Sequence, residues 1–88
     1  MIKPYEFAIS GEASRVLFGS TDRVRTRAED IFEFLARHPR TQGDFEERTS
    51  SGRIFQVKVF ENLIVTYWAD HAERELRIVR CEVIEGSR

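Results

Sequence analysis

The stretch that decides the fold runs from Arg53 to Val83 and reads RIFQVKVFENLIVTYWADHAERELRIVRCEV. Apolar and polar residues alternate from Phe55 to Val59, which is the period of a strand with one buried face. The run from Leu63 to Trp68 is apolar on both faces, as is typical of a central strand. The two runs meet at Glu61-Asn62, and a third follows the next polar segment. The pattern predicts a three-stranded meander.

The first half of the chain begins with the same period of two and then changes to a helical one. Tyr5, Phe7 and Ile9 alternate with other residues and predict a strand over Lys3–Ile9. Ser10 is placed to cap a short helix, and Gly19 is placed to end it.

A longer helix follows. Ser20 or Thr21 can cap it, and Pro39 discourages its continuation. Between them, apolar residues at offsets 0, 4, 7, 8 and 11 form one stripe: Val24, Ala28, Ile31, Phe32 and Leu35.

Two further strands are predicted. Phe45–Thr49 is a short candidate, and Leu76–Ile84 is the last strand, with Arg77 and Cys81 on one face and Arg80 on the other. The fold class is therefore α+β, with two helices packed against one face of a mostly antiparallel sheet of three to four strands. We expect a single domain over residues 1–88, with its core at about 5–84.

The charge composition predicts no general attraction to nucleic acid. The chain has 14 basic and 15 acidic residues, which gives a net charge of −1. Only Lys3 and Lys58 are lysines, so 12 of the cations are arginines, which favour bidentate contacts with phosphate or carboxylate. A local basic face is still compatible with this balance.

The sequence favours a cytoplasmic location. Cys81 is the single cysteine and cannot form an internal disulfide, which fits a reducing compartment. The first residues carry Lys3 and Pro4 where a signal peptide would be apolar. No run approaches the roughly 18 apolar residues of a membrane span, so we expect no membrane partner.

Three segments, in this order, resemble the RelE/ParE superfamily of toxins from type II toxin-antitoxin pairs. They are Phe34–Pro39 (FLARHP), Gly52–Val59 (GRIFQVKV) and Leu63–Tyr67 (LIVTY). The resemblance implies a single RelE/ParE-like domain and a cognate antitoxin as partner. It also implies ribosome-bound messenger RNA as a target for nuclease members, or DNA gyrase for others.

In the nuclease members, as the resemblance implies, basic side chains of the sheet and a tyrosine orient the RNA and stabilise charge at the scissile phosphate. The 2′-hydroxyl attacks the adjacent phosphorus, so neither a metal nor a cofactor is implied. The candidate catalytic residues of this chain are Lys58, Arg53, Arg77 and Tyr67. Trp68 and Arg80 are candidate contacts with a partner or with nucleic acid.

The chain also departs from the family pattern. Ile64 stands where the family commonly has an arginine, Gln56 replaces a neighbouring basic residue, and only Glu85–Arg88 follow the last strand. Two alternatives therefore stand beside the nuclease: a non-catalytic, gyrase-type inhibitor and a degenerate protein-binding domain. A third is an oligomer formed through the open sheet face.

Each candidate residue also has a purely structural interpretation. The basic residues can pair with Glu47, Glu75 and Glu82, and alternation puts Arg77 and Arg80 on opposite faces unless a bulge intervenes. Core packing is the alternative for Tyr67, whereas Trp68 points to the opposite face.

Other residues are predicted to be structural. Cys81 is expected to be a buried, inert thiol, and His38 and His71 lack the spacing of zinc ligands. Phe18, Phe34 and Phe60 belong either to the core or to an apolar groove for an antitoxin.

Overall fold

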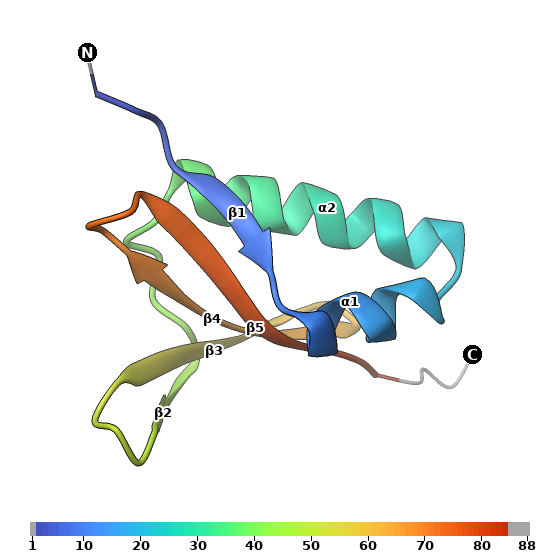
Figure 1. Cartoon of the computed structure of the whole chain (residues 1–88). Coiled ribbons are helices and arrows are strands. Elements are labelled where there is room, and N and C mark those ends of the chain that lie inside the picture. The colour runs from blue at the N-terminus through green and yellow to red at the C-terminus, as the bar shows by residue number, and fades with distance from the viewer. Residues whose placement is uncertain (1, 85–88) are drawn as a thin grey trace.

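The computed structural model describes residues 2–84 and contains two helices and five strands (Figure 1). In chain order the elements are β1 (Glu6–Ile9), α1 (Gly11–Phe18), α2 (Asp22–Arg37), β2 (Phe45–Arg48), β3 (Ile54–Phe60), β4 (Leu63–Asp70) and β5 (Glu75–Val83). The predicted order of elements is confirmed. The first and last strands begin and end at slightly different residues from those predicted.

Hydroxyl caps begin both helices. Ser10 Oγ accepts a hydrogen bond from the Ala13 amide at 3.0 Å, and Thr21 Oγ1 accepts one from the Val24 amide at 3.2 Å. These bonds satisfy amides that have no partner inside the helix. Thr21, rather than Ser20, therefore caps α2.

The sheet has five strands in the order β1-β5-β4-β3-β2. β1 pairs with β5 in parallel, and the other three pairs are antiparallel. The α+β class and the mostly antiparallel sheet are as predicted, but three to four strands was too few. The prediction missed the full count because β1 joins the sheet only through the distant β5.

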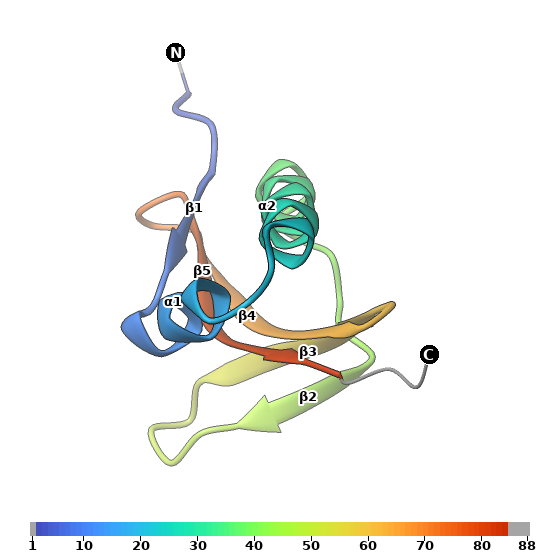
Figure 2. The ribbon, with the colours of Figure 1, turned by 90° about the vertical axis from the view of Figure 1, so that its right-hand side faces the viewer.

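The helices and the sheet enclose one core. Figure 2 shows the sheet curving around α2, so that one face lies against the helix and the other is open. Residues of α1, α2, β4 and β5 build the core, and its largest fully buried side chains are Tyr67, Phe32, Leu35, Leu63, Leu76, Ile78 and Val65. Leu63, Val65 and Tyr67 alternate along β4, so this period defines the helix-facing side of the sheet.

A β-bulge in β5 corrects the predicted alternation. Thr66 of β4 lies opposite Arg80, but the next residue, Tyr67, lies opposite Ile78, so Val79 is the extra residue. Arg77 and Arg80 therefore share the open face, and Cys81 turns into the core with Ile78. The prediction that placed Arg77 with Cys81 was wrong, because a single extra residue reverses the period of two.

Two phenylalanines assigned either to the core or to a groove lie at the surface. Phe18 is 83% exposed at the end of α1, and Phe34 is 44% exposed on α2, where its ring lies 4.7 Å from that of His38. Phe60 packs against the core. Within residues 2–84, no helix is both long and apolar enough to cross a membrane.

Candidate functional site

The sheet separates the candidate residues into two groups. Paired residues on neighbouring strands point to the same face. Lys58 lies opposite Val65, and Gln56 lies opposite Tyr67, so these side chains project on the helix-facing side. Ile64 lies opposite Val59 on the open face. An arginine at position 64 would therefore not stand beside Lys58.

Lys58 is held by a carboxylate. Its Nζ lies 3.6 Å from Asp44 Oδ1, and its side chain is only 29% exposed. Asp44 also accepts a hydrogen bond from the Val59 amide at 2.9 Å. The charge of Lys58 is therefore largely balanced inside the fold.

The Tyr67 side chain is buried, and its hydroxyl is engaged by the backbone. Only 1% of its surface is exposed, and its hydroxyl donates to the Thr41 carbonyl at 3.0 Å. Burial raises the pKa of this phenol to about 12, and the negative charge of Asp44 adds to the shift. Near neutral pH the phenol stays protonated, and its one proton is engaged. Burial of Tyr67, the structural alternative, is confirmed.

The residue before β3, the end of β4 and the start of β5 form what we call the Trp68 cluster, made of Arg53, Trp68, Asp70 and Arg77. The Arg53 guanidinium lies 3.7 Å from the centre of the indole ring, and that of Arg77 lies 5.6 Å from it. Both are within the range of cation–π attraction. Arg77 is also bound by Asp70 at 3.1 Å and by Glu75 at 2.9 Å.

The acid in the cluster is stabilised as a carboxylate. A hydrogen bond from the Glu73 amide lowers the pKa of Asp70 most, burial opposes that shift, and Arg77 and Arg53 lower the pKa further. Arg77 is therefore balanced by two carboxylates. Arg53 differs from it, since within residues 2–84 it has no carboxylate within 4.0 Å.

Arg80 lies on the same open face but is bound elsewhere. Its Nη2 lies 2.8 Å from Glu47 Oε1 of β2, and its Nε lies 3.8 Å from Glu82. The predicted alternative of pairing with glutamates is thus confirmed for these two arginines: Arg77 pairs with Glu75, and Arg80 pairs with Glu47 and Glu82.

A surface depression of about 430 Å³ brings three of the candidate residues together. Arg53, Tyr67 and Trp68 line it, but Lys58, Arg77 and Arg80 do not. The other lining residues are Pro39, Arg40, Thr41, Gln42, Ile54, Gln56, Ala69 and His71. We call this the Arg40–Arg53 depression. Two arginines and no carboxylate line it.

Sequence reasoning missed Arg40 and treated His71 as a turn residue. Both are exposed residues at the ends of elements, and neither belongs to an alternating or helical pattern. His71 contacts the Tyr5 hydroxyl through Nδ1, which joins the β4–β5 turn to the N-terminal segment. One signal was available for Arg40: the segment from Arg37 to Gly43 contains two arginines and no acidic residue.

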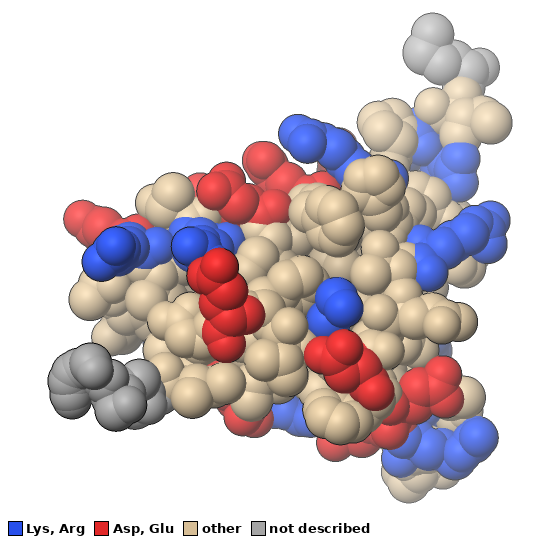
Figure 3. All heavy atoms as spheres, turned by 180° about the vertical axis from the view of Figure 1, so that it is seen from behind, with Lys and Arg blue, Asp and Glu red and all other residues tan. Residues whose placement is uncertain are grey.

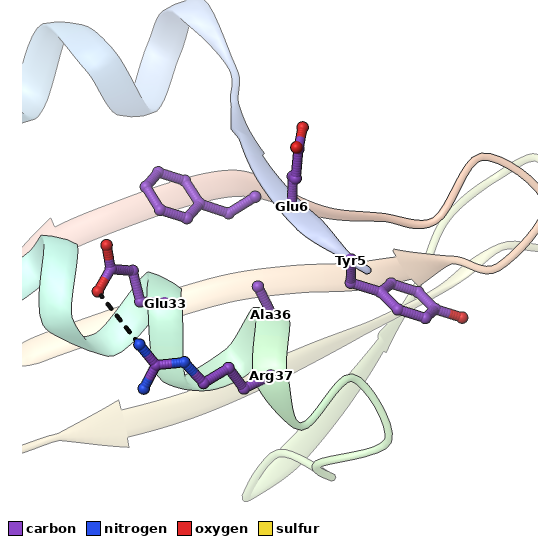
Figure 4. Close-up of a pocket in the computed structure, with 6 residues that line it drawn as sticks. Tyr5, Glu6, Glu33, Ala36 and Arg37 are labelled. Atoms are coloured by element: carbon purple, nitrogen blue, oxygen red, sulfur yellow. Dashed lines mark ion pairs between the residues drawn. The ribbon is translucent and has the colours of Figure 1, made fainter. Parts of the chain in front are cut away.

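A second depression, of about 310 Å³, lies between β1 and α2. Figure 4 shows Glu33 and Arg37 side by side there, with the Tyr5 phenol directed away from them. The Glu33–Arg37 pair is 3.9 Å long, and Glu6 adds a second carboxylate. Its lining carries more acid than base, so it is a poor site for an anion.

Charges elsewhere are mixed. On the side shown in Figure 3, basic and acidic side chains are interspersed among uncharged ones and form no single basic area. Among residues 2–84, no three His, Cys, Asp or Glu side chains gather as ligands for a metal ion. The Arg40–Arg53 depression differs from this face in that its lining carries basic residues and no carboxylate.

Neither the family models nor the curated proteins contain a match to this sequence. Solved structures do match its α+β fold. The toxin-antitoxin complex RelBE2 from Mycobacterium tuberculosis has a chain with a TM-score of 0.76 and 18% identity, covering 92% of this chain and 99% of that chain. The archaeal RelE-RelB complex from Pyrococcus horikoshii OT3 gives a TM-score of 0.71 and 12% identity, covering 97% and 100%. The chain therefore has a RelE-like fold, as the resemblance implied.

Proposed function

We propose that this chain is the toxin of a type II toxin-antitoxin pair, that it acts in the cytoplasm, and that it inhibits its target by binding. The similarity to two RelE-type complexes over nearly the whole chain supports the toxin assignment. Both of those complexes pair the fold with an antitoxin, so we infer a cognate antitoxin here as well.

The division of the candidate residues between two faces supports binding rather than RNA cleavage. Transfer of the 2′-hydroxyl proton and stabilisation of the phosphate need a base, an acid and cations around one atom. Lys58 and Tyr67 point to the helix-facing side, where Asp44 and the Thr41 carbonyl engage them. Trp68 and Arg77 lie on the other face, and of the two helix-facing residues only Tyr67 reaches the depression that Arg53 and Trp68 line.

The open face has the composition of a binding surface. Trp68 and two arginines are the residue types that most often dominate interface energy. Exposed or half-buried apolar residues continue from them across the sheet: Phe45, Val57, Val59 and Ile64. Such a surface suits a macromolecular target, and DNA gyrase is the target that the resemblance suggests.

A metal-independent messenger RNA endoribonuclease is the second candidate. One observation favours it: the Lys58–Asp44 distance of 3.6 Å is longer than a hydrogen bond, so an RNA phosphate could displace the carboxylate. In that case Lys58 would stabilise the negative charge at the cleaved phosphate.

Expression of the chain alone in bacteria tests both candidates, with growth and messenger RNA ends measured together. We expect growth arrest without new RNA ends. We also expect Trp68→Ala to relieve the arrest, and Arg23→Gln, which removes an exposed arginine of α2, to leave it unchanged.

Two outcomes would overturn the proposal in different ways. New RNA ends that disappear in Lys58→Ala would replace binding with cleavage. Normal growth, with the protein shown to be folded by circular dichroism, would reject the toxin assignment itself.

A further inference from the structure

The Arg40–Arg53 depression has the composition of an anion site. Both lining arginines are exposed, and within residues 2–84 neither has a carboxylate within 4.0 Å. The other arginines of the candidate surface, Arg77 and Arg80, are each bound by two carboxylates. The free hydrogen-bond donors of this surface therefore gather at the depression.

Arg53 is held in position by stacking instead of by an ion pair. Its guanidinium lies 3.7 Å from the centre of the Trp68 ring, which occupies a face of the group and leaves its N–H edges free. A stacked guanidinium has already lost much of its side-chain freedom, so it loses less entropy when it binds a phosphate in a bidentate manner.

The loop that carries Arg40 is also anchored. The Thr41 carbonyl accepts a hydrogen bond from the Tyr67 hydroxyl, and the Gly43 amide donates one to Gln56 Oε1 at 2.7 Å. A Cβ at position 43 would meet the backbone of Val57 at less than 3.0 Å, so the segment lies directly on β3. Arg40 is thus carried by a loop that the sheet holds in place.

Two carboxylates close to the depression are each engaged by neighbouring groups. Glu46 Oε2 accepts a hydrogen bond from Nε2 of the lining residue Gln56 at 3.4 Å. Asp70 lies close enough to Arg53 for the arginine to contribute to lowering its pKa, but its carboxylate is bound by Arg77 and by the Glu73 amide. His71, on the rim, offers its second ring nitrogen as a further polar contact.

We propose that the Arg40–Arg53 depression binds a phosphomonoester of mononucleotide size, with the phosphate between the two arginines. A volume of about 430 Å³ exceeds what a phosphate alone fills and lies in the range of small-molecule sites. The group can belong to a free nucleotide or to the phosphorylated end of an RNA chain. This binding does not depend on the toxin assignment.

Trp68 is the single tryptophan of the chain, so its fluorescence reports on the site directly. The purified protein is titrated with adenosine 5′-monophosphate, with adenosine and with inorganic phosphate. We expect the monophosphate to change the emission, added salt to weaken its binding, and adenosine to have no effect. An equal response to adenosine, or no response to the monophosphate, would overturn the proposal.

Variants identify the arginines responsible. Arg53→Gln and Arg40→Gln are each expected to weaken binding of the monophosphate about tenfold, the typical effect of removing a charged hydrogen bond. Arg23→Gln removes the same charge from an exposed position on α2 and is expected to have no effect. Because Arg40 lies on an exposed loop, its variant remains informative if Arg53→Gln disturbs Trp68. Unchanged binding in both variants would reject the site.

The source of the phosphate is resolved with short RNA. Matched oligonucleotides with and without a 5′-phosphate are compared with the mononucleotide. Tighter binding of the phosphorylated RNA than of the mononucleotide assigns the site to an RNA end, and equal binding assigns it to a free nucleotide. Equal binding of the two oligonucleotides would show that the phosphomonoester is not recognised.

Discussion

Arg77 and Arg80 lie on the same face of the sheet, although three positions along a regular strand would place them on opposite faces. Val79 is the inserted residue, and Ser10 Oγ donates to its carbonyl at 2.7 Å. The same hydroxyl caps α1 by accepting from the Ala13 amide. One side chain therefore joins the start of the first helix to the bulge.

Ser10→Ala is predicted to be more destabilising than an ordinary loss of a helix cap. It removes the cap and a hydrogen bond to the bulge, and together these are worth about 2 kcal/mol. Thr21→Ala removes only the cap of α2 and is expected to cost about 1 kcal/mol. Urea unfolding of both variants measures the difference, and equal losses would contradict a second role for Ser10.

Tyr67→Phe is predicted to lower stability by about 1 kcal/mol without abolishing toxicity. The change removes the hydrogen bond to the Thr41 carbonyl while keeping the buried ring. Denaturant unfolding gives the stability, and growth on induction gives the toxicity. Loss of toxicity with unchanged stability would instead make the phenol catalytic.

Leu35→Ala and Phe34→Ala compare adjacent positions of α2 that differ in burial. Leu35 is fully buried, so its truncation is expected to cost about 3 kcal/mol, whereas Phe34 is 44% exposed and should cost at most about 1 kcal/mol. Thermal or urea unfolding provides the comparison. Similar values for the two variants would mean that Phe34 is covered, as by a second copy in solution.

Cys81 is predicted to be unreactive in the folded protein. Burial raises the pKa of its thiol to about 11, and the charge of Glu82 acts in the same direction. At pH 8 the thiolate, which is the reactive form, is therefore rare, and the sulfur is also inaccessible. We expect iodoacetamide to label the unfolded chain much faster than the folded one. Equal labelling rates would contradict the buried position.

Asp70 is predicted to contribute to stability near neutral pH but not in acid. Its pKa is lower in the folded state, chiefly because the Glu73 amide donates to the carboxylate. Its contribution is therefore present above the ordinary aspartate pKa of about 3.9 and is lost as the pH falls through the lowered value. Asp70→Asn should be less stable than the parent at pH 7 and should approach it in acid, as the pH falls through the lowered pKa. A difference independent of pH would argue against the ionised form.

Local patterns were sufficient to predict most elements. The stripe from Val24 to Leu35 predicted α2, because the helical period is set by residues one or two turns apart. The alternating run from Phe55 to Val59 predicted β3, because the strand period is set by residues two positions apart. The turn at Glu61-Asn62 and the caps Ser10 and Thr21 are local for the same reason. Burial of Tyr67 and Cys81 also followed from periodicity and composition.

The sequence by itself therefore determined the α+β class and the order of helices and strands, because both rest on short-range periodicity, and the RelE-like resemblance, because it rests on three short segments in order. Only the tertiary structure decided the position of β1 beside β5, the shared face of Arg77 and Arg80, and the placement of Arg40 and Arg53 around one depression. Strand pairing, a one-residue bulge and the packing of a loop on a sheet are contacts between distant parts of the chain. No local pattern records them, because their energy depends on which surfaces meet in three dimensions.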